Sequence, residues 1–268
     1  MMDKLQACRL FLLDMDGTLY LDENLIPGAL DFMHGLEASG KKYIYLTNNS
    51  SRAGSDYIER LLRLGFPCPV GSVYTSGMAV AELLLARYPG ASVYCVGTAA
   101  LRGELTRYGI RLTEQEPAVV LVGFDRELHY EKLMKASRFL RRGAAFLATN
   151  PDLVCPMPGE FDDLPDCGSI CALLTKATGR EPEYIGKPAR RMVDALTARF
   201  GFPNSECAVI GDRLYTDIAT GVNAGAVSAL VLSGETKREM LDASPVKPDY
   251  IFDSVMEIGD YLNLGSGS

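Results

Sequence analysis

The stretch Arg9–Tyr20, RLFLLDMDGTLY, decides the fold. The apolar run Leu10–Leu13 has no polar alternation and ends abruptly at Asp14, which predicts a buried strand running into a loop. Beyond the strand end, residues two apart can turn the same way, so Asp14 and Asp16 could present two carboxylates to one point. Because like charges so close repel, a cation or a proton is expected between them. Gly17 permits a sharp turn that directs backbone N–H groups at whatever binds there.

Two other interpretations of this stretch compete with a binding loop. Asp and Gly after a strand are ordinary turn residues. An EF-hand calcium loop also contains Asp-x-Asp, but it requires Gly at its sixth position and Glu at its twelfth, where this chain has Leu19 and Leu25. The EF-hand interpretation therefore fails, whereas the turn interpretation stays open on this stretch alone.

Length and composition indicate a globular protein. A chain of 268 residues gives one large or two modest domains at ~150 residues per domain, and 47% hydrophobic residues suffice for full cores. No stretch of ~18 uncharged apolar residues is available for a membrane helix, and the first residues lack a signal-peptide pattern. We therefore expect a cytoplasmic protein without membrane contact. The net charge of −7 gives no basic footprint for nucleic acid.

Cysteine and histidine usage excludes several kinds of site. Seven cysteines are odd in number and mostly lie in apolar segments, which favours reduced thiols over a disulfide framework. Cys167 and Cys171 lie closest together but lack two further ligands at a spacing suited to zinc. With only His34 and His129 present, a His-rich metal centre or a Ser-His-Asp hydrolase is poorly supported.

Strand-like and helix-like segments alternate along the chain, as in a parallel sheet with helices packed on its faces. Strands are expected at Tyr43–Leu46, Val73–Thr75, Cys207–Ile210, Ala229–Leu232 and Tyr250–Phe252, with helical patterns between them. From about Gly77 to Tyr184 the alternation starts again, with strands at Ser92–Val96, Val119–Val122 and Ala144–Ala148. We therefore predict an α/β fold in which residues 1–78 and 185–268 form one core and residues 79–184 form an inserted α/β domain.

Within the insert, the amino-acid composition changes after Asn150. Prolines, glycines and acidic residues crowd the stretch before a helix expected at Ser169–Ala177. A loop this long inside a compact domain is more often functional than idle, although a solvated acidic surface loop is the alternative.

Polar side chains follow four predicted strand ends of the core. Open parallel sheets bind ligands at the carboxyl ends of their strands. Those ends offer Asp14 and Asp16, then Thr47 and Asn48, then Lys187 ahead of a helix, then Asp212 and Asp217. Carboxylates suit a hard cation, a hydroxyl and backbone amides suit phosphate oxygens, and lysine adds a positive charge. The set predicts a site for magnesium and phosphate. Asp14, Asp212 and a backbone carbonyl from the loop would bind the metal, which makes Asp14, Asp16 and Asp212 the candidate metal residues.

The electrostatics explain why such a set is needed together. A carboxylate ~4 Å from a phosphate oxygen meets a repulsion of about 4 kcal/mol per pair of unit charges at an effective dielectric constant of 20. A bridging Mg²⁺ and one ammonium group reverse this balance and stabilise the charge on the equatorial oxygens in the transition state.

Four motifs in this order resemble those of the haloacid dehalogenase-like superfamily. They are Asp14-Met15-Asp16-Gly17-Thr18, Leu46-Thr47-Asn48, Gly186-Lys187-Pro188 and Gly211-Asp212-Arg213-Leu214-Tyr215-Thr216-Asp217. The insert lies between the second and third motifs, where the superfamily carries its type-two cap, and the chain is similar to the nitrophenylphosphatase-like branch. The resemblance implies a Rossmann-like doubly wound core with an inserted cap, and magnesium-dependent hydrolysis of a small phosphomonoester.

The resemblance also implies a role for each motif residue. Asp14 would be the nucleophile that forms an aspartyl-phosphate, and Asp16 the acid and then the base. Thr47 would bind the phosphoryl group with help from Asn48, and Lys187 would neutralise the nucleophile and the phosphate. Asp212 would ligate magnesium. Asp217 would hold the metal's water shell or orient Lys187, with a simple helix-capping role as the alternative.

The resemblance leaves the substrate and several residues open. The cap would read the part of the substrate beyond phosphate through Asn150, Asp152 and the run from Cys155 to Ser169. For Arg213 two roles stay open: an ion pair with a neighbouring side chain, or a direct contact with the ligand. A phosphotransferase or mutase with the same intermediate, and a non-catalytic sensor of a phosphorylated metabolite, are the alternatives to hydrolysis. A homodimer through the cap is a further expectation.

Overall fold

In the computed structural model, which describes residues 3–156 and 163–264, strand β1 (Leu10–Leu13) lies in the middle of a six-stranded sheet. All four of its side chains are buried. It pairs in parallel with β4 (Lys42–Thr47) on one side and with β13 (Cys207–Gly211) on the other. A parallel strand buried on both faces has no solvent-facing side chains, which explains the uninterrupted apolar run. The predicted strand ending at Asp14 is therefore confirmed.

The first sheet has the strand order β15-β14-β13-β1-β4-β5. Its outer strands are β5 (Val73–Thr75), β14 (Val227–Val231) and β15 (Tyr250–Phe252). The pairs β13–β14 and β14–β15 are parallel, as are both pairs of β1. Strand order therefore reverses beside β1, and such a reversal in a parallel sheet opens a crevice at the carboxyl ends of the strands.

The second sheet has the order β12-β9-β8-β6-β7, and all of its pairs are parallel. Its strands are β6 (Ser92–Val96), β7 (Arg111–Leu112), β8 (Val119–Val122), β9 (Ala145–Ala148) and β12 (Glu183–Tyr184). The expected strands at Ser92–Val96 and Val119–Val122 are confirmed to the residue. The two-residue strands β7 and β12 are too short to leave a periodic pattern, and the sequence did not predict them.

The chain divides into two compact units, one around each sheet. The first comprises Met1–Thr47, Ile58–Tyr74 and Lys187–Ser268, and the second comprises Asn48–Tyr57 and Thr75–Gly186. The predicted insert, residues 79–184, lies entirely within the second unit. The second unit also takes in Asn48–Tyr57, which the sequence analysis assigned to the core, because side chains of this segment bond within the second unit.

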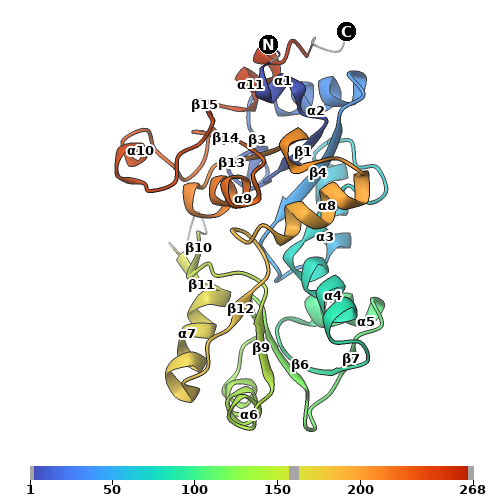
Figure 1. Ribbon diagram of the computed structural model, residues 1–268, viewed down its shortest axis with the longest axis vertical. Coiled ribbons are helices and arrows are strands. Elements are labelled where there is room, and N and C mark those ends of the chain that lie inside the picture. Colours follow the sequence, from blue (N-terminus) through green and yellow to red (C-terminus); the bar gives the residue numbers. More distant parts are fainter. Residues whose placement is uncertain (1–2, 157–162, 265–268) are drawn as a thin grey trace. The chain divides into compact units, whose positions relative to one another are not determined.

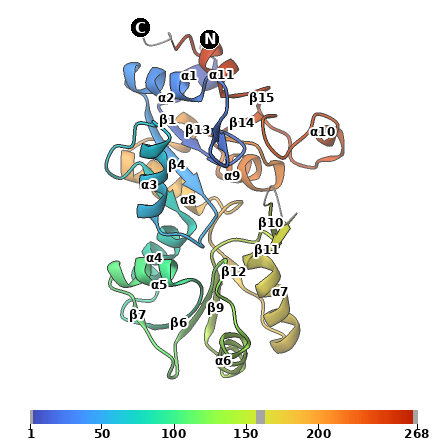
Figure 2. The ribbon, with the colours of Figure 1, turned by 180° about the vertical axis from the view of Figure 1, so that it is seen from behind.

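Helices flank both sheets. In the first unit, α2 and α11 pack together near the two ends of the described chain (Figures 1 and 2). In the second unit, α6 packs against α7 and α4 against α5. The described helices are α1 (Lys4–Ala7), α2 (Ala29–Ala38), α3 (Gly54–Arg63), α4 (Ser76–Arg87), α5 (Ala99–Arg107), α6 (Tyr130–Arg141), α7 (Cys167–Thr178), α8 (Arg191–Phe200), α9 (Ala219–Ala224), α10 (Met240–Ala243) and α11 (Val255–Tyr261), with short turns η1 (Asn204–Glu206) and η2 (Leu214–Ile218).

Two small hairpins depart from the prediction. β2 (Tyr20–Leu21) pairs with β3 (Asn24–Leu25), and β10 (Val154–Pro156) pairs with β11 (Asp163–Pro165), both antiparallel. The second hairpin lies in the stretch that we expected to be an irregular loop. Its prolines hide the strand pattern, because proline is depleted in strands. Glu160 and Asp162 of that acidic stretch, and the Gly265–Ser268 tail, lie outside the described residues.

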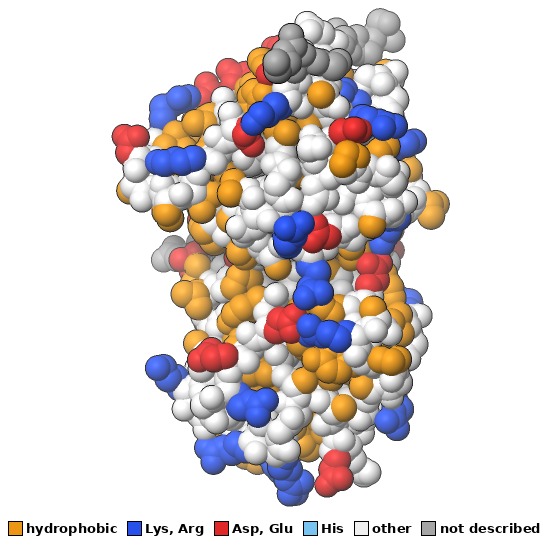
Figure 3. Space-filling model, viewed as in Figure 1, with side chains coloured by type: hydrophobic (Ala, Val, Ile, Leu, Met, Phe, Trp, Pro, Cys, Tyr) orange, Lys and Arg blue, Asp and Glu red, His pale blue; other side chains and the backbone are white. Residues whose placement is uncertain are grey.

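Three surface features bear on the kind of protein this is: apolar helices, the distribution of charge, and the cysteines. Within residues 3–156 and 163–264, no helix combines the length and apolar composition needed to cross a membrane. On the face shown in Figure 3, lysine and arginine side chains are interspersed with aspartate and glutamate. All seven cysteines are free thiols.

Candidate active site

Strand register brings Asp14 and Asp212 together. Leu13 of β1 lies opposite Ile210 of β13, so the residues that follow both strands emerge at the same edge of the sheet. The Asp14 backbone N–H donates to the Ile210 carbonyl at 2.8 Å, which fixes the chain beyond the strand end. The strand-end argument from the sequence therefore holds for this pair of carboxylates.

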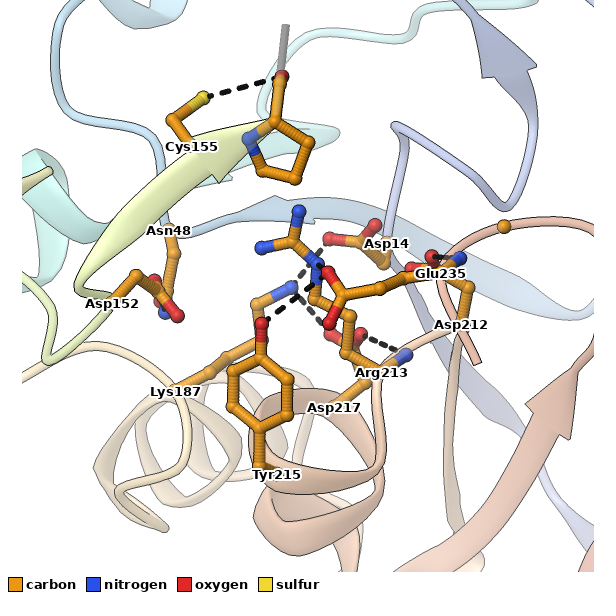
Figure 4. Close-up of polar contacts among 12 residues, drawn as sticks. Asp14, Asn48, Asp152, Cys155, Lys187, Asp212, Arg213, Tyr215, Asp217 and Glu235 are labelled. Carbon is orange, nitrogen blue, oxygen red and sulfur yellow. Dashed lines mark hydrogen bonds and ion pairs between the residues drawn. The ribbon is translucent and has the colours of Figure 1, made fainter. Parts of the chain in front are cut away.

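Lys187 lies between two of the acidic side chains. Its Nζ donates to Asp14 Oδ1 at 2.5 Å and to Asp217 Oδ1 at 2.5 Å, and the side chain is buried (Figure 4). Burial alone would lower the pKa of Lys187, but the Asp14 and Asp217 carboxylates outweigh it and raise that pKa above its ordinary value. The side chain is therefore a fixed positive charge and not a solvated surface lysine.

Asp217 orients Lys187 and does not cap helix α9. Its Oδ2 accepts the Arg213 backbone N–H at 3.1 Å while its Oδ1 accepts from Lys187. Asp217 lies inside the π-helical turn η2, and α9 begins two residues later with no side-chain cap. Gly211 leaves room for this carboxylate, because a Cβ there would lie 2.3 Å from Asp217 Cγ. The contact with Lys187 is one of the two roles that the resemblance implied.

The carboxylates of Asp14, Asp212 and Asp217 form a group suited to a divalent cation. One oxygen of each lies within 4.8 Å of the others. Asp212 Oδ2 accepts the Glu235 backbone N–H at 2.6 Å, whereas the buried Asp212 Oδ1 has no hydrogen-bond partner among the described residues. Three carboxylates against one ammonium leave a formal excess of two negative charges, and an orphaned buried acceptor needs a partner. The residues present therefore fit a hard divalent ion.

Burial raises the pKa values of two carboxyl groups in the same cluster. Burial and the neighbouring Asp217 charge raise the pKa of Asp212 to about 6. Burial also raises the pKa of the Asp14 carboxyl, against the opposing effect of Lys187. Both directions indicate that the negative charge is under-compensated by protein groups alone, as expected where a cation binds.

The side chain of Asp16 does not join this group of described residues. Half of it is exposed, and its Oδ1 lies 3.9 Å from Arg60 Nη1. The residue forms an isolated bridge with Tyr20, and Gly17 turns the chain at φ +81°, so the strand alternation assumed for Asp14 and Asp16 ends at β1. The group of described carboxylates therefore consists of Asp14, Asp212 and Asp217, and the Asp16 side chain lies outside it.

The remaining predicted binding residues are divided between the two units. Thr47 is the buried last residue of β4 in the first unit. Asn48 and Asn150 belong to the second unit, and both donate their side-chain amides to Asp152 Oδ2 at 2.8 Å. The Asn48 side chain, predicted to bind phosphate, is thus engaged with Asp152 (Figure 4).

Comparison with known proteins identifies the family. A model described as "Haloacid dehalogenase-like hydrolase" matches residues 11–111, and a related model, HAD-hydrolase-like, matches residues 184–258. Ribonucleotide monophosphatase NagD of Escherichia coli is 38% identical over 245 residues, which cover 91% of this chain and 96% of the relative. The chain belongs to the haloacid dehalogenase-like hydrolase family.

Further relatives carry different names. An acid sugar phosphatase of Staphylococcus aureus is 34% identical over 92% of this chain and 95% of its own length. The crystal structure of a 4-nitrophenylphosphatase from Thermotoga maritima superposes with a TM-score of 0.93 at 42% identity, covering 97% of this chain and 99% of that one. The α/β fold expected from the resemblance, with its Rossmann-like parallel-sheet core, is therefore confirmed.

This hydrolase has a site element that the sequence analysis missed, the loop Ser233–Thr236 after β14. The loop donates the Glu235 N–H to Asp212 Oδ2, and Ser233 Oγ donates to the Gly17 carbonyl at 2.7 Å. Glu235 Oε2 also lies 2.9 Å from Arg213 Nε, so Arg213 has an ion-pair partner within the loop. β14 is a fourth parallel strand whose carboxyl end faces the same edge. The rule that open parallel sheets bind ligands at the carboxyl ends of their strands would therefore have predicted this loop.

Gly234 lies directly against the predicted metal ligand. A Cβ at this position would lie 2.0 Å from Asp212 Oδ2, so Gly234→Ala must displace that carboxylate. We expect the substitution to weaken Mg²⁺ binding by roughly 10- to 100-fold, measured by calorimetric titration without substrate. Gly103→Ala in α5 is the control, because a Cβ there meets nothing within 4 Å, and it should leave Mg²⁺ affinity unchanged. Equal affinities for all three proteins would contradict the assignment of Asp212.

Proposed function

We propose that this hydrolase releases inorganic phosphate from small phosphomonoesters through an aspartyl-phosphate on Asp14, with Mg²⁺ as cofactor. The observation that carries the proposal is the Lys187 ammonium held between Asp14 and Asp217 beside the unpartnered Oδ1 of Asp212. That arrangement supplies a nucleophilic carboxylate, a fixed positive charge and room for a cation. The relatives named as nucleotide, sugar and nitrophenyl phosphatases support the reaction class.

In the first half of the reaction, an Asp14 carboxylate oxygen attacks phosphorus. The new bond joins Asp14 to phosphorus while the bond from phosphorus to the leaving oxygen breaks, and Asp16 gives its proton to that oxygen. Lys187 lowers the repulsion between Asp14 and the incoming phosphate, which is about 4 kcal/mol per charge pair at ~4 Å and an effective dielectric constant of 20. The Thr47 hydroxyl hydrogen-bonds the phosphoryl group as it transfers.

In the second half, water replaces Asp14 on phosphorus. Asp16, now ionised, takes a proton from the water as it attacks, and the bond between Asp14 and phosphorus breaks to regenerate the carboxylate. Asp217 keeps the Lys187 ammonium aimed at Asp14 through both steps, because its Oδ1 accepts from the same Nζ. Mg²⁺ held by Asp14 and Asp212, with Asp217 alongside, would supply positive charge to the phosphate oxygens.

The division of labour between the units is part of the proposal. The first unit would be the catalytic core, and the second a cap that reads the leaving group through Asn150, Asp152 and the β10–β11 hairpin. The small alcohol that leaves stays unspecified, since the relatives differ in the substrates that their names give. A cytoplasmic location and a homodimer through the cap stay predictions from the sequence.

Phosphate release from a panel of nucleoside monophosphates, sugar phosphates and 4-nitrophenyl phosphate tests the proposal. We expect release that EDTA abolishes and added Mg²⁺ restores. Phosphorylated alcohol in place of inorganic phosphate, when a sugar acceptor is added, would instead show a phosphotransferase. Binding of phosphoesters without release of phosphate from any of them would favour the sensor alternative.

Asp16→Asn should separate the two halves of the reaction. With 4-nitrophenyl phosphate the leaving group needs little protonation, so a burst of nitrophenolate should precede a slow steady state. With an alkyl phosphate both steps need Asp16, and we expect a loss of about 10²–10⁴-fold with no burst. Stopped-flow absorbance and quenched phosphate assays measure the two cases. Asp22→Asn, in the turn between β2 and β3, is the exposed control. Wild-type rates for Asp16→Asn on both substrates would remove Asp16 from the mechanism.

A further inference from the structure

Asp152 is a buried carboxylate that serves as a hydrogen-bond acceptor for two asparagine side chains. It lies in the second unit between β9 and β10 and is 5% exposed. Its Oδ2 accepts from Asn48 Nδ2 and from Asn150 Nδ2, each at 2.8 Å. Within residues 3–156 and 163–264, its buried Oδ1 has no hydrogen-bond partner. A carboxylate accepts hydrogen bonds only, so burying one against two amide donors fixes the orientation of both amides.

Asn48 makes further hydrogen-bond and packing contacts within the second unit. Its carbonyl accepts the Ser76 hydroxyl at 2.6 Å. Gly186 packs against its side chain so closely that a Cβ there would lie 2.5 Å from Asn48 Oδ1. Two residues on, Ser50 Oγ lies 2.9 Å from Thr149 Oγ1 and accepts the Phe124 backbone N–H at 2.9 Å. The segment that follows Thr47 is therefore fixed through side chains to the carboxyl edge of the second sheet.

We propose that Asp152 is a positioning residue for phosphate binding: by holding Asn48, it fixes the backbone directly after Thr47 without itself touching phosphate. The inference rests on the proposed function, which places the transferring phosphoryl group at Thr47. It also changes the role of the Asn48 side chain from a phosphate ligand to an anchor. A carboxylate is suited to this task because it can accept both amides with one oxygen.

The same carboxylate connects the phosphate-binding segment with the base of the β10–β11 hairpin. Asn150 Nδ2 also lies 3.3 Å from Asp166 Oδ1, and Asp166 caps the start of α7 by accepting the Cys167 backbone N–H. Asn150 thus links Asp152, which lies ahead of the hairpin, to Asp166, which follows it. A variant that breaks the acceptor at Asp152 should therefore impair phosphate binding even when the substrate has no leaving group to read.

Inorganic phosphate is the probe for this inference, because it lacks a leaving group. Asp152→Ala should raise the dissociation constant of phosphate, titrated at fixed Mg²⁺, by about tenfold, the change expected from losing hydrogen bonds to a charged group. Asp152→Asn should stay within about threefold of wild type, because its carbonyl oxygen can accept from Asn48 and Asn150 in the same way. Glu181→Ala removes an exposed carboxylate elsewhere in the second unit and is the matched control.

Two results would overturn the inference. One is a wild-type phosphate dissociation constant and wild-type kcat and KM for Asp152→Ala. The other is an Asp152→Asn protein that is as impaired as Asp152→Ala, because then the charge and not the acceptor matters. If Asp152→Ala does not fold, Asn48→Ala removes the other partner and should weaken phosphate binding by the same factor. Unchanged phosphate binding in folded Asn48→Ala would equally contradict the positioning role.

These experiments distinguish failure of the positioning role of Asp152 from failure of the proposed function. If the wild type releases no phosphate from any ester, the proposed reaction is wrong, yet phosphate binding still compares Asp152→Ala with Asp152→Asn. If the wild type is active and Asp152→Ala matches it in both phosphate binding and turnover, only the positioning role is wrong. When both variants fold, the double variant Asn48→Ala/Asp152→Ala should lose no more than either single one, because both remove the same contact.

Discussion

Asp14→Asn should abolish phosphate release, with a loss of at least ~10⁴-fold in kcat, as for removal of other enzymatic nucleophiles. The amide oxygen can still accept a hydrogen bond from Lys187, so the variant should fold and bind inorganic phosphate. It cannot form an aspartyl-phosphate, because a neutral amide is a poor nucleophile at phosphorus. Steady-state phosphate release under saturating substrate and Mg²⁺ measures the effect.

Asp31→Asn makes the same change at an exposed position of α2 and should retain full activity. Freshly prepared Asp14→Asn should be assayed, since deamidation would restore aspartate. Turnover by this variant at more than about one hundredth of the wild-type rate, constant with age of the preparation, would rule out Asp14 as nucleophile.

Lys187→Met should produce the second largest loss, on the order of 10²–10³-fold in kcat, because it removes a fixed charge aimed at the reacting group. It also leaves the buried Asp217 and the partly buried Asp14 without their shared partner. Breaking a buried ion pair in this way costs about 3–5 kcal/mol of folding stability. We therefore expect a lower melting temperature without Mg²⁺ and a larger Mg²⁺-induced rise than in the wild type.

Lys42→Met is the control for Lys187→Met, because Lys42 is an exposed lysine at the opposite end of β4. Thermal melts with and without Mg²⁺, together with phosphate release, separate the loss of stability from the loss of catalysis. A Lys187→Met protein with wild-type kcat and melting temperature would show that the ammonium is dispensable. An equal loss in Lys42→Met would mean that the effect is not specific to the site.

The core of the fold could be predicted because its determinants are local. Leu10–Leu13 and Cys207–Ile210 are uninterrupted apolar runs bounded by Asp or Gly, and parallel strands buried on both faces require such runs. Lys187 and Asp217 were found for a related reason. Both lie at or just beyond the carboxyl edge of the sheet, where polar residues after apolar runs indicate ligand binding.

What the sequence did not reveal depends on contacts between distant segments. The hydrogen bond between Asn48 and Asp152 joins residues 104 positions apart, and no periodicity signals it. The side chain of Asp16 lies outside the carboxylate group of described residues and near Arg60, and the chain turns at Gly17, which a strand pattern does not describe. The close approach of Gly234 to Asp212 is likewise a property of packing, visible only once β13 and β14 are paired.

The most direct test of the account is to trap the covalent intermediate. Wild-type protein turning over a phosphomonoester with Mg²⁺ should be acid-quenched and reduced with borohydride, which converts an aspartyl-phosphate to homoserine. Peptide mass spectrometry should then find homoserine at position 14, dependent on substrate and absent in Asp14→Asn. Homoserine at another position, or none at a time when a burst of product shows that an intermediate has accumulated, would contradict the assignment of Asp14.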